Sequence, residues 1–184
     1  MQRINFIGLG NMGGRMAARL NANGYAVSGL DARPAVAEEL SLHGLETVAD
    51  ACDADALFLS LPSSREVEEV FEAPGGILES AAPGLVVVDM TTAEADSTRR
   101  LYARARSAGV ALLDAPISGG PAPADAGTLT IMVGGDEEAL ARLRPALDVL
   151  GSTVHYLGAS GNGHVAKAVN NFLNAVNLAA TAEA

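Results

Sequence analysis

The chain has little of what several common kinds of site require. Cys52 is its only cysteine, which excludes an intrachain disulfide and a cysteine-rich metal centre. The three histidines share no metal-ligand spacing, so we expect no bound metal. No apolar run approaches the roughly 18 residues of a membrane span, and no signal-like stretch precedes the first predicted strand. We therefore expect a cytoplasmic protein that binds no membrane.

Positive charge is scarce as well. Twelve Lys and Arg residues stand against 22 Asp and Glu residues, which gives a formal net charge of -10. Nucleic acids and anionic membranes bind cationic surfaces, so neither is an expected partner. With 49% hydrophobic and 18% charged residues, the 184-residue chain has the composition of a globular protein with one good-sized core.

Short β-rich runs alternate with longer helix-like ones. The predicted strands are Arg3–Ile7, Ala26–Leu30, Ala56–Leu59, Val86–Asp89, Ala111–Asp114, Leu129–Val133 and Val154–Leu157. The predicted helices between them are Met12–Ala22, Ala35–Leu42, Arg65–Phe71, Ala93–Ala108 and Glu137–Leu150. Strands that are apolar on both faces and separated by helices predict an α/β fold with a Rossmann-type, doubly wound, mostly parallel sheet.

The last segment, residues 160–184, reads as a single helix with many apolar residues and no capping signal at its end. We expect it to be the beginning of a long interdomain helix, with its apolar side chains covered by a further segment or by another chain. The alternative is an ordinary C-terminal helix packed on its own sheet.

A glycine-rich loop follows the first predicted strand. Gly8-Leu9-Gly10-Asn11-Met12-Gly13 has the pattern Gly-x-Gly-x-x-Gly, and a predicted helix follows at once. The first glycine permits a tight turn, the second lets the backbone approach a pyrophosphate, and the third lets helix and strand pack closely. The helix N-terminus offers N–H groups to the phosphates. A purely structural turn is the alternative, but this position favours a dinucleotide-binding domain over residues 1–159.

Asp31 lies at the end of the second predicted strand. A carboxylate there can accept both ribose hydroxyls of NAD and repels a 2′-phosphate. Arg33 could offer that phosphate a cation, so NAD is the expected cofactor and NADP stays open. The alternative for Asp31 is a cap for the helix predicted after Pro34.

Four further segments follow predicted strands, at the edge where ligands bind in open α/β sheets. They are Leu61-Pro62-Ser63, Asp89-Met90-Thr91-Thr92, Asp114-Ala115-Pro116-Ile117-Ser118-Gly119-Gly120 and Gly161-Asn162-Gly163-His164-Val165-Ala166-Lys167-Ala168-Val169-Asn170-Asn171. In this order and spacing, the chain resembles the β-hydroxyacid dehydrogenases, the family of 3-hydroxyisobutyrate dehydrogenase. The resemblance covers essentially the whole chain. It implies that the all-helical domain with which such enzymes continue lies outside these 184 residues.

The resemblance also implies a role for individual residues. The loop from Gly8 to Gly13 would bind the cofactor, and further cofactor contacts would come from Leu61, Pro62 and Thr92. The substrate would be bound by Ser118, Gly119, Gly120 and Asn171. Lys167 matches the catalytic lysine. Where the family often has Ser-Thr followed shortly by Pro, this chain has Thr91-Thr92-Ala93-Glu94-Ala95, which keeps the hydroxyl.

Lys167 suits proton transfer on chemical grounds. It is the only lysine of the chain, and burial beside a cofactor would lower its pKa toward neutrality. Asn171 follows four residues later, on the same face of the predicted helix. The alternative for Lys167 is a solvated surface lysine. His164, one turn earlier, either influences Lys167 or faces solvent, and Asp114 is expected to be structural.

The function implied by the resemblance is an NAD(P)-dependent oxidoreductase. It would transfer hydride between nicotinamide and a small 3-hydroxy acid, with Lys167 as general acid/base, in a homo-oligomer such as a dimer. Two alternatives stay open: a non-catalytic dinucleotide-binding module or truncated domain, and an enzyme like the related imine reductases. Lys167 counts against the imine reductases, which usually replace this lysine.

Overall fold

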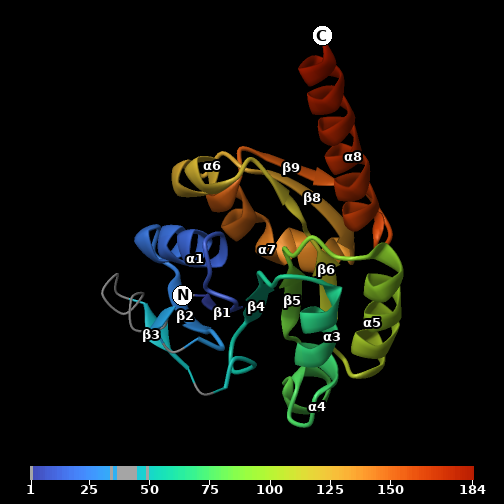
Figure 1. Cartoon of the computed structure of the whole chain (residues 1–184). Helices are drawn as coiled ribbons and strands as arrows, with labels where there is room; N and C mark the ends of the chain where they lie inside the picture. The colour runs from blue at the N-terminus through green and yellow to red at the C-terminus, as the bar shows by residue number, and fades with distance from the viewer. Residues whose placement is uncertain (1, 34, 37–44, 49) are drawn as a thin grey trace.

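A doubly wound α/β sheet forms the body of the molecule (Figure 1). The computed structural model describes residues 2–33, 35–36, 45–48 and 50–184. Strands in these ranges are β1 (Arg3–Ile7), β2 (Ala26–Leu30), β3 (Glu46–Thr47), β4 (Ala56–Leu59), β5 (Val86–Asp89), β6 (Ala111–Asp114), β7 (Ile117–Ser118), β8 (Thr130–Gly135) and β9 (Thr153–Tyr156). Their order across the sheet is β3-β2-β1-β4-β5-β6-β8-β7, with β9 paired to β8.

The sheet is parallel from β3 to β6, and its direction changes at β8. β8 pairs antiparallel with β6 and β7, whereas β9 runs parallel to β8. From β1 the chain goes outward through β2 to β3 and then returns to β4 on the other side of β1. Strand order therefore reverses between β1 and β4. In open α/β sheets, the carboxyl ends of the strands at such a reversal form a crevice for ligands.

Helices cover both faces of the sheet (Figure 1). One face carries α1 (Gly13–Ala22), α6 (Pro121–Ala126) and α7 (Glu137–Leu150), and the other carries α3 (Ser64–Glu72), α4 (Ile77–Ser80) and α5 (Ala95–Ser107). Each face therefore has its own hydrophobic core, which is why β4 and β5 are apolar on both sides.

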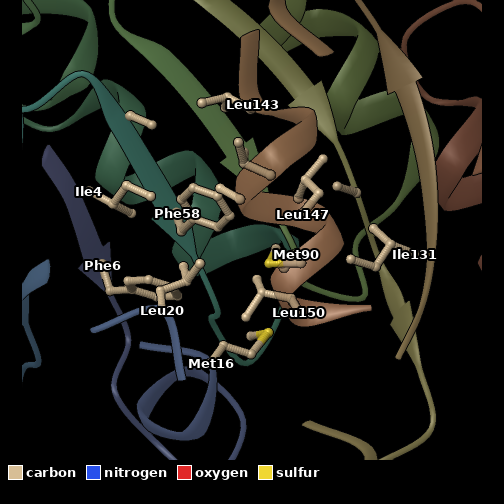
Figure 2. Close-up of a cluster of buried hydrophobic side chains, with 14 of the residues drawn as sticks. Ile4, Phe6, Met16, Leu20, Phe58, Met90, Ile131, Leu143, Leu147 and Leu150 are labelled. Atoms are coloured by element: carbon tan, nitrogen blue, oxygen red, sulfur yellow. The ribbon is translucent and has the colours of Figure 1, made fainter. Parts of the chain in front are cut away.

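The core under α1 and α7 is the larger of the two (Figure 2). The rings of Phe6 and Phe58, from β1 and β4, stack there with centroids 5.1 Å apart. Leu143, Leu147 and Leu150 recur at helical spacing on α7 and are fully buried in the same core. The ring stacking adds to the parallel pairing of β1 with β4, which sets the crevice at their carboxyl ends.

The last helix, α8 (Asn162–Glu183), begins against the sheet and then projects from the body (Figure 1). Gly163 and His164 in its first turn are buried, whereas Phe172 and Leu178 are 67% and 73% exposed. The alternative predicted from the sequence, a helix packed on its own sheet, therefore holds only for the beginning of α8. Within the described ranges, no helix is long and apolar enough to cross a bilayer.

All seven predicted strands are present within one or two residues of the predicted bounds. The sequence missed β3, β7, α4 and α6, which are too short to show a hydrophobic period, and it placed Ile117 and Ser118 in a loop. The helix predicted over Ala35–Leu42 falls largely outside the described residues.

Candidate functional site

The glycine loop between β1 and α1 is very tightly packed. Gly8 has a φ of 88°, in the left-handed region that favours glycine. A Cβ on Gly8 would lie 2.2 Å from the carbonyl oxygen of Ser60, in the loop after β4. A Cβ on Gly13 would lie 1.9 Å from the carbonyl oxygen of Gly8. Only glycine at these two positions lets both loops and the start of α1 approach so closely.

The N-terminus of α1 is open at this turn. Among the described residues, no side chain caps its first N–H groups, although the N–H of Gly14 donates to the carbonyl oxygen of Gly10 at 2.9 Å, and its first turn contains no acidic residue. The first N–H groups of a helix have no partner within the helix, and they carry the positive end of its dipole. Beside a glycine turn, such an end suits a phosphate group. These residues therefore fit the pyrophosphate of a dinucleotide.

A pocket of about 1080 Å³ opens beside the loop. The predicted cofactor residues that line it are Gly8, Gly10, Asn11, Met12, Asp31, Leu61 and Pro62. Leu9 is buried, and Gly13 packs against Gly8 without lining the pocket. Thr92 is exposed and lies outside this pocket.

The far wall of the pocket comes from residues that the sequence did not single out. They include Ala51, Cys52, Glu66, Glu69, Val70, Gly75, Gly76 and Ser80, around α3 and α4. Burial raises the pKa of the Cys52 thiol, and the Ser80 hydroxyl lies 3.4 Å from its sulfur. No motif marks these positions, because the fold alone brings them to the glycine loop.

Asp31 connects the end of β2 to the glycine loop. Its Oδ2 accepts the backbone N–H of Leu9 at 2.8 Å, and its Oδ1 accepts the backbone N–H of Arg33 at 2.9 Å. The Arg33 side chain binds both oxygens, with Nε 3.0 Å from Oδ1 and Nη2 3.2 Å from Oδ2. Partial burial alone would raise the pKa of Asp31, but the hydrogen bonds and charge of Arg33 outweigh it and hold that pKa below its ordinary value. The carboxylate is therefore ionised in the pocket wall.

Lys167 lies in the second turn of α8. It is partly buried, and this burial lowers the pKa of its amine. Within the described residues it forms no ion pair. A fully solvated surface lysine does not describe this position, because part of the side chain is removed from water.

The predicted substrate residues lie near the same end of α8. Asn170, three residues after Lys167, donates from Nδ2 to Oγ of Ser118 in β7 at 3.5 Å. Ser118 is followed by Gly119 and Gly120, both with positive φ, so the backbone turns sharply after β7. The structure therefore brings Ser118 beside α8, while Asn171 is exposed on that helix.

His164 ties the first turn of α8 to two other elements. Its Nε2 lies 3.0 Å from the carbonyl oxygen of Thr91, after β5, and its Nδ1 lies 2.7 Å from Oγ1 of Thr98 in α5. Nε2 carries a proton, because a carbonyl oxygen only accepts. His164 is 1% exposed, so the alternative in which its side chain faces solvent is wrong. Asp89 Oδ2 is 3.9 Å away; burial raises the pKa of Asp89 and the nearby His164 opposes that rise.

The pocket lies in the crevice that the strand order defines, since it is lined by the ends of β1 and β2 and by the loop after β4. Comparison with known proteins assigns the chain to a family. The NAD binding domain of 6-phosphogluconate dehydrogenase matches residues 3–158. The chain is 43% identical to the NAD-dependent L-serine dehydrogenase of Pseudomonas aeruginosa and 38% identical to the 3-hydroxyisobutyrate dehydrogenase of that organism. The chain belongs to the β-hydroxyacid dehydrogenase family.

A solved structure of this family has the same fold. The 3-hydroxyisobutyrate dehydrogenase of Mycobacterium tuberculosis superposes with a TM-score of 0.93 at 38% identity. All three relatives are matched over 100% of this chain, which spans 63% of their length. The β-hydroxyacid dehydrogenase resemblance and the Rossmann-type fold predicted from the sequence are thus confirmed. In the described residues, no group of three His, Cys, Asp or Glu side chains could hold a metal ion.

Proposed function

We propose that this chain is the cofactor-binding part of an NAD(P)-dependent dehydrogenase that oxidises a small 3-hydroxy acid. The observation that carries the proposal is the placement of Lys167. An amine whose pKa is lowered by burial lies on the helix that Ser118 contacts, on a fold whose glycine loop is shaped for a dinucleotide. A lower pKa makes the neutral, proton-accepting form of an amine more abundant at a given pH.

The bound nicotinamide supplies the hydride acceptor, and the chain supplies binding and proton transfer. Lys167 Nζ, in its neutral form, takes the proton of the substrate hydroxyl. The backbone N–H groups of Gly119 and Gly120 and the Ser118 hydroxyl bind the substrate carboxylate. Asn171, four residues after Lys167 on the same side of α8, donates a further hydrogen bond that orients the substrate.

The substrate class follows from what the relatives are named for. L-serine, 2-(hydroxymethyl)glutarate and 3-hydroxyisobutyrate give their names to dehydrogenases 43%, 39% and 38% identical to this chain. All three compounds carry a hydroxymethyl group on the carbon next to a carboxylate. We propose this shared unit as the part of the substrate that Lys167 and the Ser118 turn recognise.

The cofactor is proposed as NAD or NADP. A relative at 32% identity with a TM-score of 0.93, Psf3, has been solved with NADP+. An imine reductase of Myxococcus stipitatus solved with NAD+ is only 19% identical, so its likeness shows the fold alone. The apolar side chains exposed on α8 support the expected homo-oligomer, in which they would be covered.

The test is an NAD(P)-linked activity screen over L-serine, 3-hydroxyisobutyrate and 2-(hydroxymethyl)glutarate. We expect Lys167→Ala to lower turnover by about 10²–10⁴ while NADH affinity stays within twofold. Arg144→Gln, on the far helix α7, is the matched control and should leave both unchanged. Near-wild-type turnover in Lys167→Ala would contradict the role of the lysine. In a protein of the relatives' full length, dinucleotide binding without turnover on any substrate would favour a non-catalytic binding module.

A further inference from the structure

The carboxylate of Asp31 has no spare acceptor position. A carboxylate offers about four lone-pair sites. Here the backbone N–H groups of Leu9 and Arg33 fill two, and the Nε and Nη2 of Arg33 fill the other two. Yet the two ribose hydroxyls of NAD need an acceptor at this position. Asp31 can bind that diol only after the Arg33 side chain has released the carboxylate.

Arg33 is able to do so. Its side chain is 64% exposed, whereas that of Asp31 is 6% exposed, so the arginine can rotate into water while the carboxylate stays in place. The arginine end of the pair is open to water, which can replace the hydrogen bonds that the guanidinium gives up when it rotates outward. The backbone bonds from Leu9 and Arg33 then keep the carboxylate oriented.

When Arg33 stays paired with Asp31, the site favours a 2′-phosphate over the free ribose diol. The guanidinium cancels the negative charge that would repel a 2′-phosphate, and its bonds to Asp31 use only two of its five N–H donors. A Cβ on Gly10 would lie 3.2 Å from Nη2, which puts this group directly over the glycine loop. Arg33 is also the only basic side chain among the described residues lining the pocket, where Asp50, Glu66 and Glu69 are acidic.

We propose that Arg33 is a two-position specificity residue: turned outward it leaves Asp31 to bind the ribose diol of NAD, and paired with Asp31 it binds the 2′-phosphate of NADP. One site would therefore accept both cofactors. This inference rests on the proposed dinucleotide-binding function and adds the residue that decides between its two forms. Since no second cation lines the described part of the pocket, Arg33 is the cationic partner available there to the 2′-phosphate.

The test measures the dissociation constants of NADH and NADPH by titration calorimetry, without any activity assay. We expect wild type to bind both. Arg33→Gln should weaken NADPH binding about ten- to hundredfold, the loss expected for hydrogen bonds to a charged group. The same change should leave NADH binding unchanged or improve it severalfold, because Asp31 is freed. Arg33→Lys keeps the charge without the two-pronged geometry and should retain part of the NADPH affinity.

Arg144→Gln removes an arginine of similar exposure from an ion pair outside the pocket, and it should change neither constant. The proposal is overturned if wild type binds NADH but not NADPH, or if Arg33→Gln changes both constants by the same factor. If wild type binds neither cofactor, the proposed dinucleotide-binding function fails as well. The two failures are thus distinguishable. Because the Arg33 side chain is exposed, the variants should melt like wild type, which a thermal scan checks.

Discussion

Asp114 Oδ2 accepts the backbone N–H of His164 at 3.1 Å, so a side chain at the end of β6 caps the first turn of α8. Its other oxygen accepts the backbone N–H of Gly161 at 2.8 Å. Gly163, between them, has no room for a side chain, because a Cβ would lie 2.8 Å from Asp114 Oδ2. The helix that carries Lys167 is therefore anchored on a buried carboxylate.

We expect Asp114→Asn to lower the free energy of unfolding by about 1–3 kcal/mol, because one of the two buried N–H groups then loses its acceptor. Urea denaturation measures this. Asp148→Asn changes a half-exposed carboxylate that pairs with Arg144 on α7, and its effect should stay within about 0.5 kcal/mol. Equal unfolding midpoints for the two variants would show that Asp114 does not anchor α8.

The two last glycines of the loop should respond differently to alanine. At Gly13 the new methyl group would lie 1.9 Å from a backbone oxygen, so we expect a loss of stability of more than about 2 kcal/mol. At Gly10 its nearest neighbour is the mobile end of Arg33, 3.2 Å away, so stability should stay within about 1 kcal/mol. Gly10→Ala should nevertheless weaken NADH binding, because the methyl group keeps the pyrophosphate from the backbone. Thermal melts and calorimetry on both variants separate the two effects.

A third prediction concerns the pH dependence of stability at Lys167. The pKa of this amine is lower in the folded chain than in the unfolded chain, so between the two values the unfolded chain binds more protons. Stability relative to Lys167→Met therefore rises with pH across that window. At pH 7 we expect Lys167→Met to be the more stable protein, by less than about 1 kcal/mol because water screens a partly buried amine.

The difference between wild type and Lys167→Met should shrink as the pH approaches about 10.4, the ordinary pKa of lysine. Denaturation series in urea from pH 7 to that value measure it. Lys167→Arg stays charged throughout and serves as the control, with a difference from Lys167→Met that does not change with pH. A constant wild-type difference would mean that the pKa of Lys167 is not lowered by folding.

Much of the fold could be predicted because its signals are local. The run that became β4 is apolar at every position and follows Asp55, and the run that became β5 is apolar up to Asp89, its last residue. The two-residue strands β3 and β7 carry no such signal, since they exist only through pairing with β2 and β8. Their residues are ordinary loop residues until the neighbouring strand is in place.

The candidate site also has one part that the sequence could predict and one part that it could not. The spacing of the glycines found the turn at Gly8 and Gly13, because the need for glycine there is a property of the backbone. The cofactor contact of Thr92, which the resemblance implies, stays a prediction. Its neighbour Thr91, to which the sequence assigned no role, is buried, and its Oγ1 accepts the N–H of Leu61 at 3.1 Å. The pairing of Arg33 with Asp31 depends on a side-chain rotamer, which no sequence pattern encodes.

The proposed cofactor-binding residues and most of the proposed substrate-binding residues lie on different sides of the change in strand direction at β8. The groups proposed to bind the cofactor follow β1, β2 and β4, whereas the groups proposed to meet the substrate come from the chain after β6. An insertion or a new loop between β7 and α8 can therefore remodel substrate choice while the phosphate turn stays untouched. Such remodelling has to preserve Asp114, because this carboxylate holds the start of α8.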